Sequence, residues 1–246
     1  MQSVRWTGFG ISNALTRMAL HFFPSAGNVS APYPVTCKLT IFAAGLEPIS
    51  IAVDGLRLSQ PEGVWMDEAF PAIKAQNLAL YAVEVSMSCT QQRVDLSSSS
   101  CIFEFCSPGQ SIRFLPILSD RPAPNTGPQI GAAIKDGFCS SSILLANFGS
   151  SACKPEIVVG IVGSNEPKLL GLPKSLAEIG LPARALIEVE LEEIFMSGFA
   201  GELAPVECSW GLVRSRALEV KAAEGLCAFM VYRDNLTKRP LSITAL

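Results

Sequence analysis

The sequence is poor in charged residues and contains a single histidine, His21. Charged residues make up 17% of the chain, whereas soluble domains usually carry about 25%. One histidine excludes a histidine-rich zinc site, and it limits any Ser-His or Cys-His catalytic arrangement to His21 itself. Hydrophobic residues make up 49% of the chain. A chain this apolar has more hydrophobic surface than a monomer readily buries, so we expect a homodimer.

Long hydrophobic runs and basic runs are also missing. The longest strongly apolar stretch, residues 157–163, is far shorter than the roughly 20 residues of a membrane-spanning helix. The first residues lack the continuous apolar core of a signal peptide. The net charge is −3 without a cluster of Lys and Arg, which disfavours a phosphate-binding face. We therefore expect a cytoplasmic protein that neither inserts into a membrane nor binds nucleic acid.

Motifs for catalysis and cofactor binding are absent as well. The sequence has no G-x-x-x-x-G-K-[ST], G-x-G-x-x-G or G-x-S-x-G pattern, which disfavours nucleotide binding and a nucleophile elbow. The eight cysteines include no C-x-x-C pair, and most have apolar neighbours, so we predict buried free thiols. The sequence thus predicts no catalytic residue, no metal and no cofactor.

Short strand-like segments fill most of the chain. In residues 185–191, Ile187 and Val189 alternate with Glu188 and Glu190, which indicates a half-buried strand. Other strands are expected at residues 18–25, 35–44, 83–88, 93–96, 101–105, 141–148, 156–163, 207–213, 217–221 and 227–233. Glu47-Pro48 is interpreted as the turn that follows the strand at 35–44. Many short strands with frequent turns predict an all-β fold, namely an antiparallel β-sandwich with very short helical turns.

The sequence of the first half returns in the second half. Four pieces match in the same order, at offsets of 123 to 126 residues: 67–70 with 192–195, 83–87 with 206–210, 101–103 with 227–229, and 115–117 with 241–243. Matches at nearly one spacing predict a tandem duplication of one sandwich domain.

A segment rich in proline separates the two halves. Residues 119–128 contain three prolines and a glycine, a composition that favours an extended chain. We therefore predict a first β-sandwich repeat at 1–118, a linker at 119–128 and a second β-sandwich repeat at 129–246.

Candidate binding residues lie at one strand end and at the histidine. Tyr232, Arg233 and Asp234 place an aromatic ring, a guanidinium and a carboxylate where a predicted strand meets a loop. His21 lies in a predicted strand beside two phenylalanines. For all four residues the alternative is a structural role, as an ion pair at a turn or a histidine at the rim of the core.

The second half resembles the sensory rhodopsin transducer family of small bacterial β-sandwich proteins. The resemblance rests on Asn125-Thr126-Gly127-Pro128, the strand at 142–147, Pro182 with the alternating strand into Leu191-Glu192-Glu193-Ile194, and the closing pieces 228–233 and 240–246. The family's His-Thr-Arg stretch corresponds to Val231-Tyr232-Arg233, of which only the arginine is kept. The resemblance implies a non-catalytic protein that acts as a signal partner or ligand-binding module. It also implies an assembly of four domains, which a chain of two domains forms as a dimer.

These features favour a non-catalytic binding or adaptor protein with a protein or carbohydrate ligand, related to signalling or to carbohydrates. One alternative is an acid-base hydrolase that uses Asp67 and Glu68 or Glu190 and Glu192, since paired carboxylates perform glycoside chemistry. The other alternative is a structural subunit of a larger assembly.

Overall fold

The computed structural model describes residues 2–23, 35–54, 62–89, 96, 99–118, 131–132, 138–161, 168–169, 180–190, 216–221 and 225–245. The chain divides into two compact units, Met1–Pro124 and Asn125–Leu246. This division falls within the segment 119–128 that the sequence predicts as a linker. The linker residues themselves lie outside the described residues.

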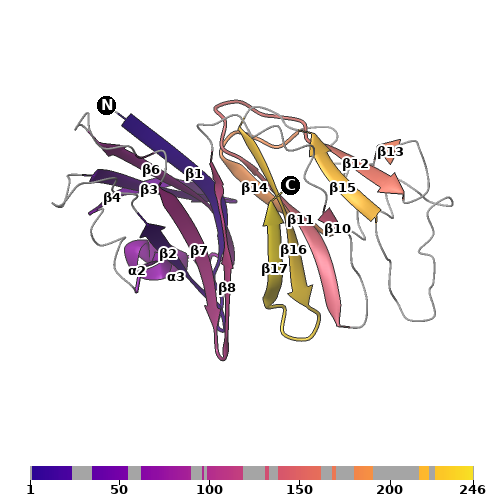
Figure 1. Ribbon diagram of the computed structural model, residues 1–246, viewed down its shortest axis with the longest axis horizontal. Helices are drawn as coiled ribbons and strands as arrows, with labels where there is room; N and C mark the ends of the chain where they lie inside the picture. Colours follow the sequence, from indigo (N-terminus) through magenta and orange to yellow (C-terminus); the bar gives the residue numbers. More distant parts are fainter. Residues whose placement is uncertain are drawn as a thin grey trace. The chain divides into compact units, whose positions relative to one another are not determined.

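Two antiparallel sheets build the described part of unit 1 (Figure 1). The first sheet has the strand order β4 (Leu46–Asp54), β3 (Val35–Ala43), β6 (Leu80–Cys89), β1 (Gln2–Ile11) and β9 (Ile117–Leu118). The second sheet has the order β5 (Val64–Trp65), β2 (Arg17–Phe23), β7 (Ser100–Ser107) and β8 (Gln110–Phe114). Two short helices, α2 (Met66–Ala69) and α3 (Pro71–Ala75), follow β5.

Aromatic side chains fill the space between these two sheets. Phe9 of β1 lies 5.7 Å from Phe105 and 5.3 Å from Phe114, measured between ring centres. Trp6 of β1 meets Phe22 of β2 edge-to-face at 5.7 Å. All five rings are less than 9% exposed, and such contacts add to the free energy gained from burial alone. Unit 1 is therefore a β-sandwich with an aromatic core.

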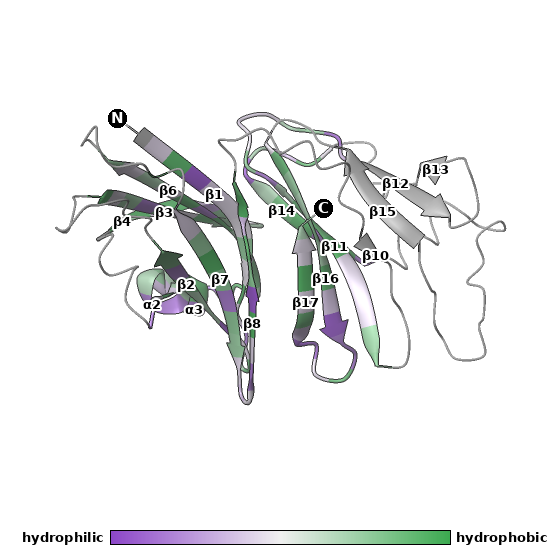
Figure 2. Ribbon diagram, in the orientation of Figure 1, coloured by the Kyte–Doolittle hydropathy of each residue, from purple (hydrophilic) through white to green (hydrophobic). Residues whose placement is uncertain are grey.

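Two antiparallel sheets also build the described part of unit 2. One has the strand order β10 (Gly131–Ala132), β15 (Arg216–Lys221), β12 (Glu156–Ile161) and β13 (Lys168–Leu169). The other has the order β14 (Ala185–Glu190), β11 (Cys139–Asn147), β16 (Leu226–Asp234) and β17 (Pro240–Ala245). The hydropathy colours of Figure 2 show β11 and β16 as mainly apolar over much of their length, in agreement with their burial.

The strand orders of the two units correspond one to one. Adding nine to each label converts β4-β3-β6-β1 into β13-β12-β15-β10, and β5-β2-β7-β8 into β14-β11-β16-β17. Unit 1 alone has β9 at the edge beyond β1 among the described strands. A tandem duplication would produce this correspondence.

The all-β prediction is confirmed, but the turn predicted at Glu47-Pro48 is wrong. Pro48 lies inside β4, and the turn before this strand contains Gly45, whose φ of 74° favours glycine. Proline is tolerated there because β4 is an edge strand. The place of β6 is taken in unit 2 by β15. Residues 206–210 lie outside the described residues, so the match of 83–87 with 206–210 stays a prediction. The predicted strands at 207–213 and, apart from its last residue, 93–96 lie outside the described residues.

The register also tests two of the other matches. Phe103 pairs with Phe114, and Phe229 pairs with Ala245. If Phe103 and Phe229 are equivalent, Phe114 corresponds to Ala245, so Leu115 does not correspond to Leu241. The 101–103 match thus fits the strand order, whereas the 115–117 match is wrong.

Candidate functional site

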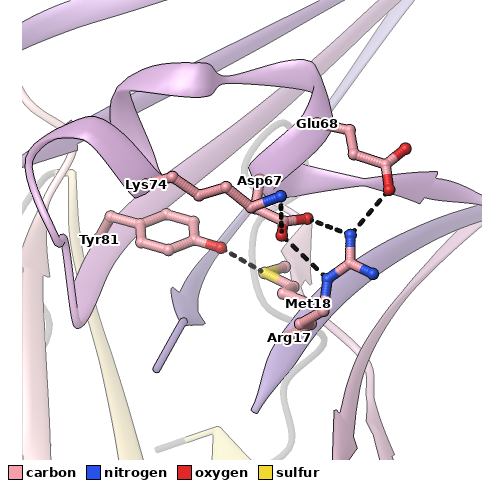
Figure 3. Close-up of polar contacts among 6 residues, drawn as sticks. All are labelled: Arg17, Met18, Asp67, Glu68, Lys74 and Tyr81. Carbon is pink, nitrogen blue, oxygen red and sulfur yellow. Dashed lines mark hydrogen bonds and ion pairs between the residues drawn. The ribbon is translucent and has the colours of Figure 1, made fainter. Parts of the chain in front are cut away.

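A cluster of charged side chains joins β2 to the two helices of unit 1 (Figure 3). The Arg17 guanidinium donates to Asp67 at 2.9 and 2.7 Å and to Glu68 at 2.8 Å. It also lies over the Trp65 ring, with its central carbon 4.3 Å from the ring centre. Lys74 reaches Asp67 from α3 at 3.0 Å. Arg17 thereby fastens the helical turn to the edge of the β5-β2-β7-β8 sheet.

Asp67 is the buried anion of this cluster, with 5% of the residue exposed. Burial by itself would raise the pKa of its carboxyl, but hydrogen bonds from Arg17 and Lys74 outweigh burial and lower the pKa. A glycosidase needs one carboxyl whose raised pKa keeps its proton for the leaving group. Asp67 has the opposite property, and its neighbour Glu68 shares the same guanidinium.

Tyr81 of β6 is buried next to this cluster. Its hydroxyl points to the sulfur of Met18 at 3.8 Å, as Figure 3 shows. Burial, followed by the charge of Asp67, raises the pKa of this phenol. The neighbouring strand leaves room for the ring at Gly10, where a Cβ would collide with the Tyr81 ring. Tyr81 is therefore a neutral core residue.

The second charged cluster surrounds Glu104 of β7. His21 Nε2 on β2 lies 2.6 Å from Glu104 Oε2, and Arg113 Nε on β8 donates to Oε1 at 2.9 Å. The Ser111 hydroxyl also donates to Oε1. Burial would raise the pKa of Glu104, but the bonds from Ser111, Arg113 and His21 outweigh it and lower the pKa.

The Glu104 cluster resembles a hydrolytic triad in composition but differs from one in geometry. In a triad the histidine accepts the proton of the nucleophilic hydroxyl, and the carboxylate orients the histidine from the other side. Here Ser111 and His21 both bond to the carboxylate of Glu104. Glu104 is the centre of the network, which joins β2, β7 and β8 across their outer face.

A third cluster lies in unit 2. Arg233 of β16 donates to both carboxylate oxygens of Glu188 on β14, through Nη2 at 2.9 Å and Nε at 3.0 Å. The Ser142 hydroxyl on β11 donates to the same carboxylate. The side chains of Arg233 and Glu188 are 14% and 21% exposed. This fork geometry holds three adjacent strands together.

Asp234 stabilises the turn between β16 and β17. Its carboxylate accepts bonds from the Thr237 amide at 2.6 Å and the Thr237 hydroxyl at 2.7 Å. These bonds lower the pKa of Asp234. Backbone bonds from Lys238 to Asp234 and from Asp234 to Arg239, each 2.9 Å, complete the turn.

The four predicted binding residues thus have different surroundings. His21 bonds to Glu104, Arg233 bonds to Glu188, and Asp234 bonds to Thr237. Tyr232 pairs with Ser141 and Ser242 on the neighbouring strands. His21 belongs to unit 1 and the other three residues to unit 2. The binding role of these four residues stays a prediction.

Two exposed apolar side chains lie beside the turn at the end of β16. Phe138 is 84% exposed and Leu236 is 91% exposed. The Asn235 amide donates to the Phe138 carbonyl at 2.8 Å, so the two residues belong to neighbouring backbone segments. We call Phe138 and Leu236 the apolar tip of unit 2. Sequence reasoning missed it, although a leucine between the turn residues Asn235 and Thr237 was a usable signal.

Neither a metal-binding cluster nor a membrane-spanning helix occurs in the part of the chain that the structure describes. There, His, Cys, Asp and Glu side chains form no group of three or more that could hold a metal ion. No helix among these residues combines the length and the apolar character needed to cross a bilayer.

Comparison of the chain with protein-family models, with curated proteins and with solved structures finds no match. The resemblance to the sensory rhodopsin transducer family therefore stays an expectation from the sequence.

Proposed function

We propose that the chain is a non-catalytic binding or adaptor protein that engages a protein partner through the apolar tip of unit 2. The single observation that carries this proposal is the exposure of Leu236, on a turn fixed by Asp234, and of Phe138 on the neighbouring backbone segment. A rigid turn displays a side chain with little loss of conformational entropy on binding. Large apolar residues in such a position are typical of interaction sites.

The chemistry of the partner follows from the surroundings of the tip. Lys238 is exposed in the same turn, while the carboxylate of Asp234 is occupied by Thr237. The tip therefore fits a pocket that is apolar inside and acidic at its rim. We propose a partner protein with such a pocket, in the cytoplasm.

The charged clusters also favour binding over catalysis. The lowered pKa values of Asp67 and Glu104 disfavour proton donation. Glu188, the partner of Arg233, is likewise engaged by a guanidinium and a hydroxyl. Side chains with saturated hydrogen bonds support the sheets and leave little capacity for a substrate.

Site-specific photo-crosslinking tests the proposal. A photoreactive phenylalanine analogue placed at position 236 should give one dominant adduct in cells. Excess unlabelled wild-type protein should abolish the adduct, whereas a Phe138→Ser, Leu236→Asn double variant should not compete. Equal competition by wild type and double variant would contradict a role of the tip.

The matched control places the same analogue at Ser50 of β4, which is exposed in the other unit. At position 50 we expect no adduct whose yield falls when excess wild-type protein is added. A circular dichroism melt of the double variant should match that of the wild type, because both side chains are solvated in the folded state.

A further inference from the structure

Strand β17 is an edge strand with an unusual composition. It pairs with β16, and its other side ends the β14-β11-β16-β17 sheet in the described structure. Its six residues, Pro-Leu-Ser-Ile-Thr-Ala, include no charged side chain. Exposed strand edges offer free backbone donors and acceptors, and proteins usually protect them with charges, prolines or bulges.

The other long edge strands in the described structure carry such protection. β4 contains Glu47 and Pro48, β8 contains Arg113, and β14 contains Glu188 and Glu190. In β17 the protection is confined to one end, where Pro240 lies opposite Arg233 and Leu241 is the extra residue of a β-bulge. Residues 242–245 pair regularly with β16, and no described strand pairs with their outer side. These four residues form the open stretch of β17. Figure 2 shows this contrast as purple segments on β8 and green to pale colours on β17.

The open stretch is complementary to itself in the antiparallel direction. If two copies pair around a two-fold axis at Ile243, that residue faces its own copy. Ser242 then faces Thr244 of the copy. Opposed hydroxyl pairs and opposed aliphatic side chains both stabilise antiparallel strands, and an uncharged strand meets no repulsion from its copy.

We propose that β17 pairs with β17 of a second copy of this chain, in antiparallel orientation around Ile243. The two sheets then continue into one another, and the backbone groups on the outer side of residues 242–245 gain partners. Because β17 is the one edge of this kind among the described strands, the pairing closes at a dimer. This interface is separate from the apolar tip, so a monomeric variant retains partner binding and a tip variant retains the dimer.

A lysine on the exposed edge tests the proposal. Thr244 is exposed on β17, and Thr244→Lys places a charge where the copies would meet. Sedimentation velocity should be measured at a series of micromolar concentrations. The apparent mass of wild-type protein should rise from 26.2 kDa toward twice that value as the concentration increases. The variant should dissociate at least about tenfold more readily.

Gln110→Lys on β8 is the matched control. Gln110 is exposed on the strand that takes the place of β17 in unit 1, and the change adds the same charge. This variant should dimerise like wild type. A dimer that Gln110→Lys breaks and Thr244→Lys spares would overturn the proposal, as would wild-type protein that stays monomeric throughout the series.

Hydrogen exchange gives a second measurement that needs no variant. Amides of residues 242–245 that face the second copy should exchange faster on dilution, while those of β16 stay protected. Exchange of β17 that is independent of concentration in a dimeric sample would also overturn the proposal.

Discussion

Glu104 illustrates how single residues combine charge and burial in this protein. Only 7% of the residue is exposed, and an isolated ionised carboxylate in such a place would be strongly unfavourable. His21, Ser111 and Arg113 provide the compensating hydrogen bonds. The network therefore stabilises the β2-β7-β8 sheet.

Replacing Glu104 by glutamine should make the stability of the protein less dependent on pH. The folded-state pKa of Glu104 lies below its ordinary value of 4.5, so its ionised form stabilises the fold above that value. This contribution is lost as the pH falls through the folded-state pKa. Glu104→Gln should cost about 1–3 kcal/mol at neutral pH. Urea unfolding at a series of pH values should show the difference from wild type shrinking in acid; a constant difference would contradict it.

Gly10 should be intolerant of any side chain. A Cβ there would overlap the buried Tyr81 ring, and overpacking a rigid core costs about 1–3 kcal/mol. Gly10→Ala should therefore lower the midpoint of urea unfolding with an unchanged slope. Gly45→Ala is the control, since no atom lies within 4 Å of its added Cβ and its cost arises from the positive φ alone. Equal losses from both variants would contradict the steric account.

Sequence reasoning at the residue scale identified polar residues but not their partners. His21 and Arg233 were predicted as candidates, yet Glu104 lies 83 residues from His21 and Glu188 lies 45 residues from Arg233. Such distances in sequence are bridged by strand pairing, which no local pattern encodes. The sequence therefore leaves both a binding role and a structural role open for His21 and Arg233.

At the scale of elements, the α2–α3 turn depends on one buried carboxylate. Asp67 accepts from both Arg17 and Lys74, but the two donors differ in exposure, at 42% and 62% of their side chains. Arg17 also stacks on Trp65. The contact with Arg17 should therefore contribute most of the stabilisation.

Asp67→Asn and Lys74→Ala should separate these contributions. Asp67→Asn leaves Arg17 without its bidentate acceptor and should destabilise unit 1 by about 1–3 kcal/mol. Lys74→Ala removes an exposed ion pair and should cost less than about 1 kcal/mol. Denaturant unfolding followed by tryptophan fluorescence measures both. A larger loss in Lys74→Ala than in Asp67→Asn would refute this order.

The elements themselves were only partly predictable. Strands with continuous apolar runs or alternation, such as β11, β14 and β16, were predicted at nearly their observed positions. β1 was missed, although it lies between β6 and β9 in the first sheet. Its glycines, Gly8 and Gly10, lower the strand propensity of the segment. They are present because Phe103 and Tyr81 fill the space of their missing side chains.

At the scale of the whole molecule, the common strand order of the two units supports the proposed tandem duplication. The sequence matches alone were a weak guide, since one of them pairs residues that the strand register separates. After a duplication the strand order is retained longer than the residue identities, because many combinations of apolar side chains can fill the same core. The charged clusters differ between the units. The Glu104 cluster joins β2, β7 and β8, whereas the Glu188 cluster joins β11, β14 and β16, the counterparts of β2, β5 and β7.

Each unit should therefore respond separately to substitution. We expect calorimetry to resolve two unfolding transitions, with Glu104→Gln lowering one and Glu188→Gln lowering the other. Each unit is large enough to fold around its own core. A single transition that both substitutions lower equally would show that the units unfold together.

The measurement that tests the central claim most directly is the sign of the stability change when the buried anions are neutralised. Residues kept for catalysis often destabilise the fold, so their replacement commonly stabilises a protein. Residues that hold the sheets together behave in the opposite way. Urea unfolding of Asp67→Asn, Glu104→Gln and Glu188→Gln should show a loss of stability in all three variants. A gain in any of them would contradict a purely structural role for that cluster and would favour a catalytic site there.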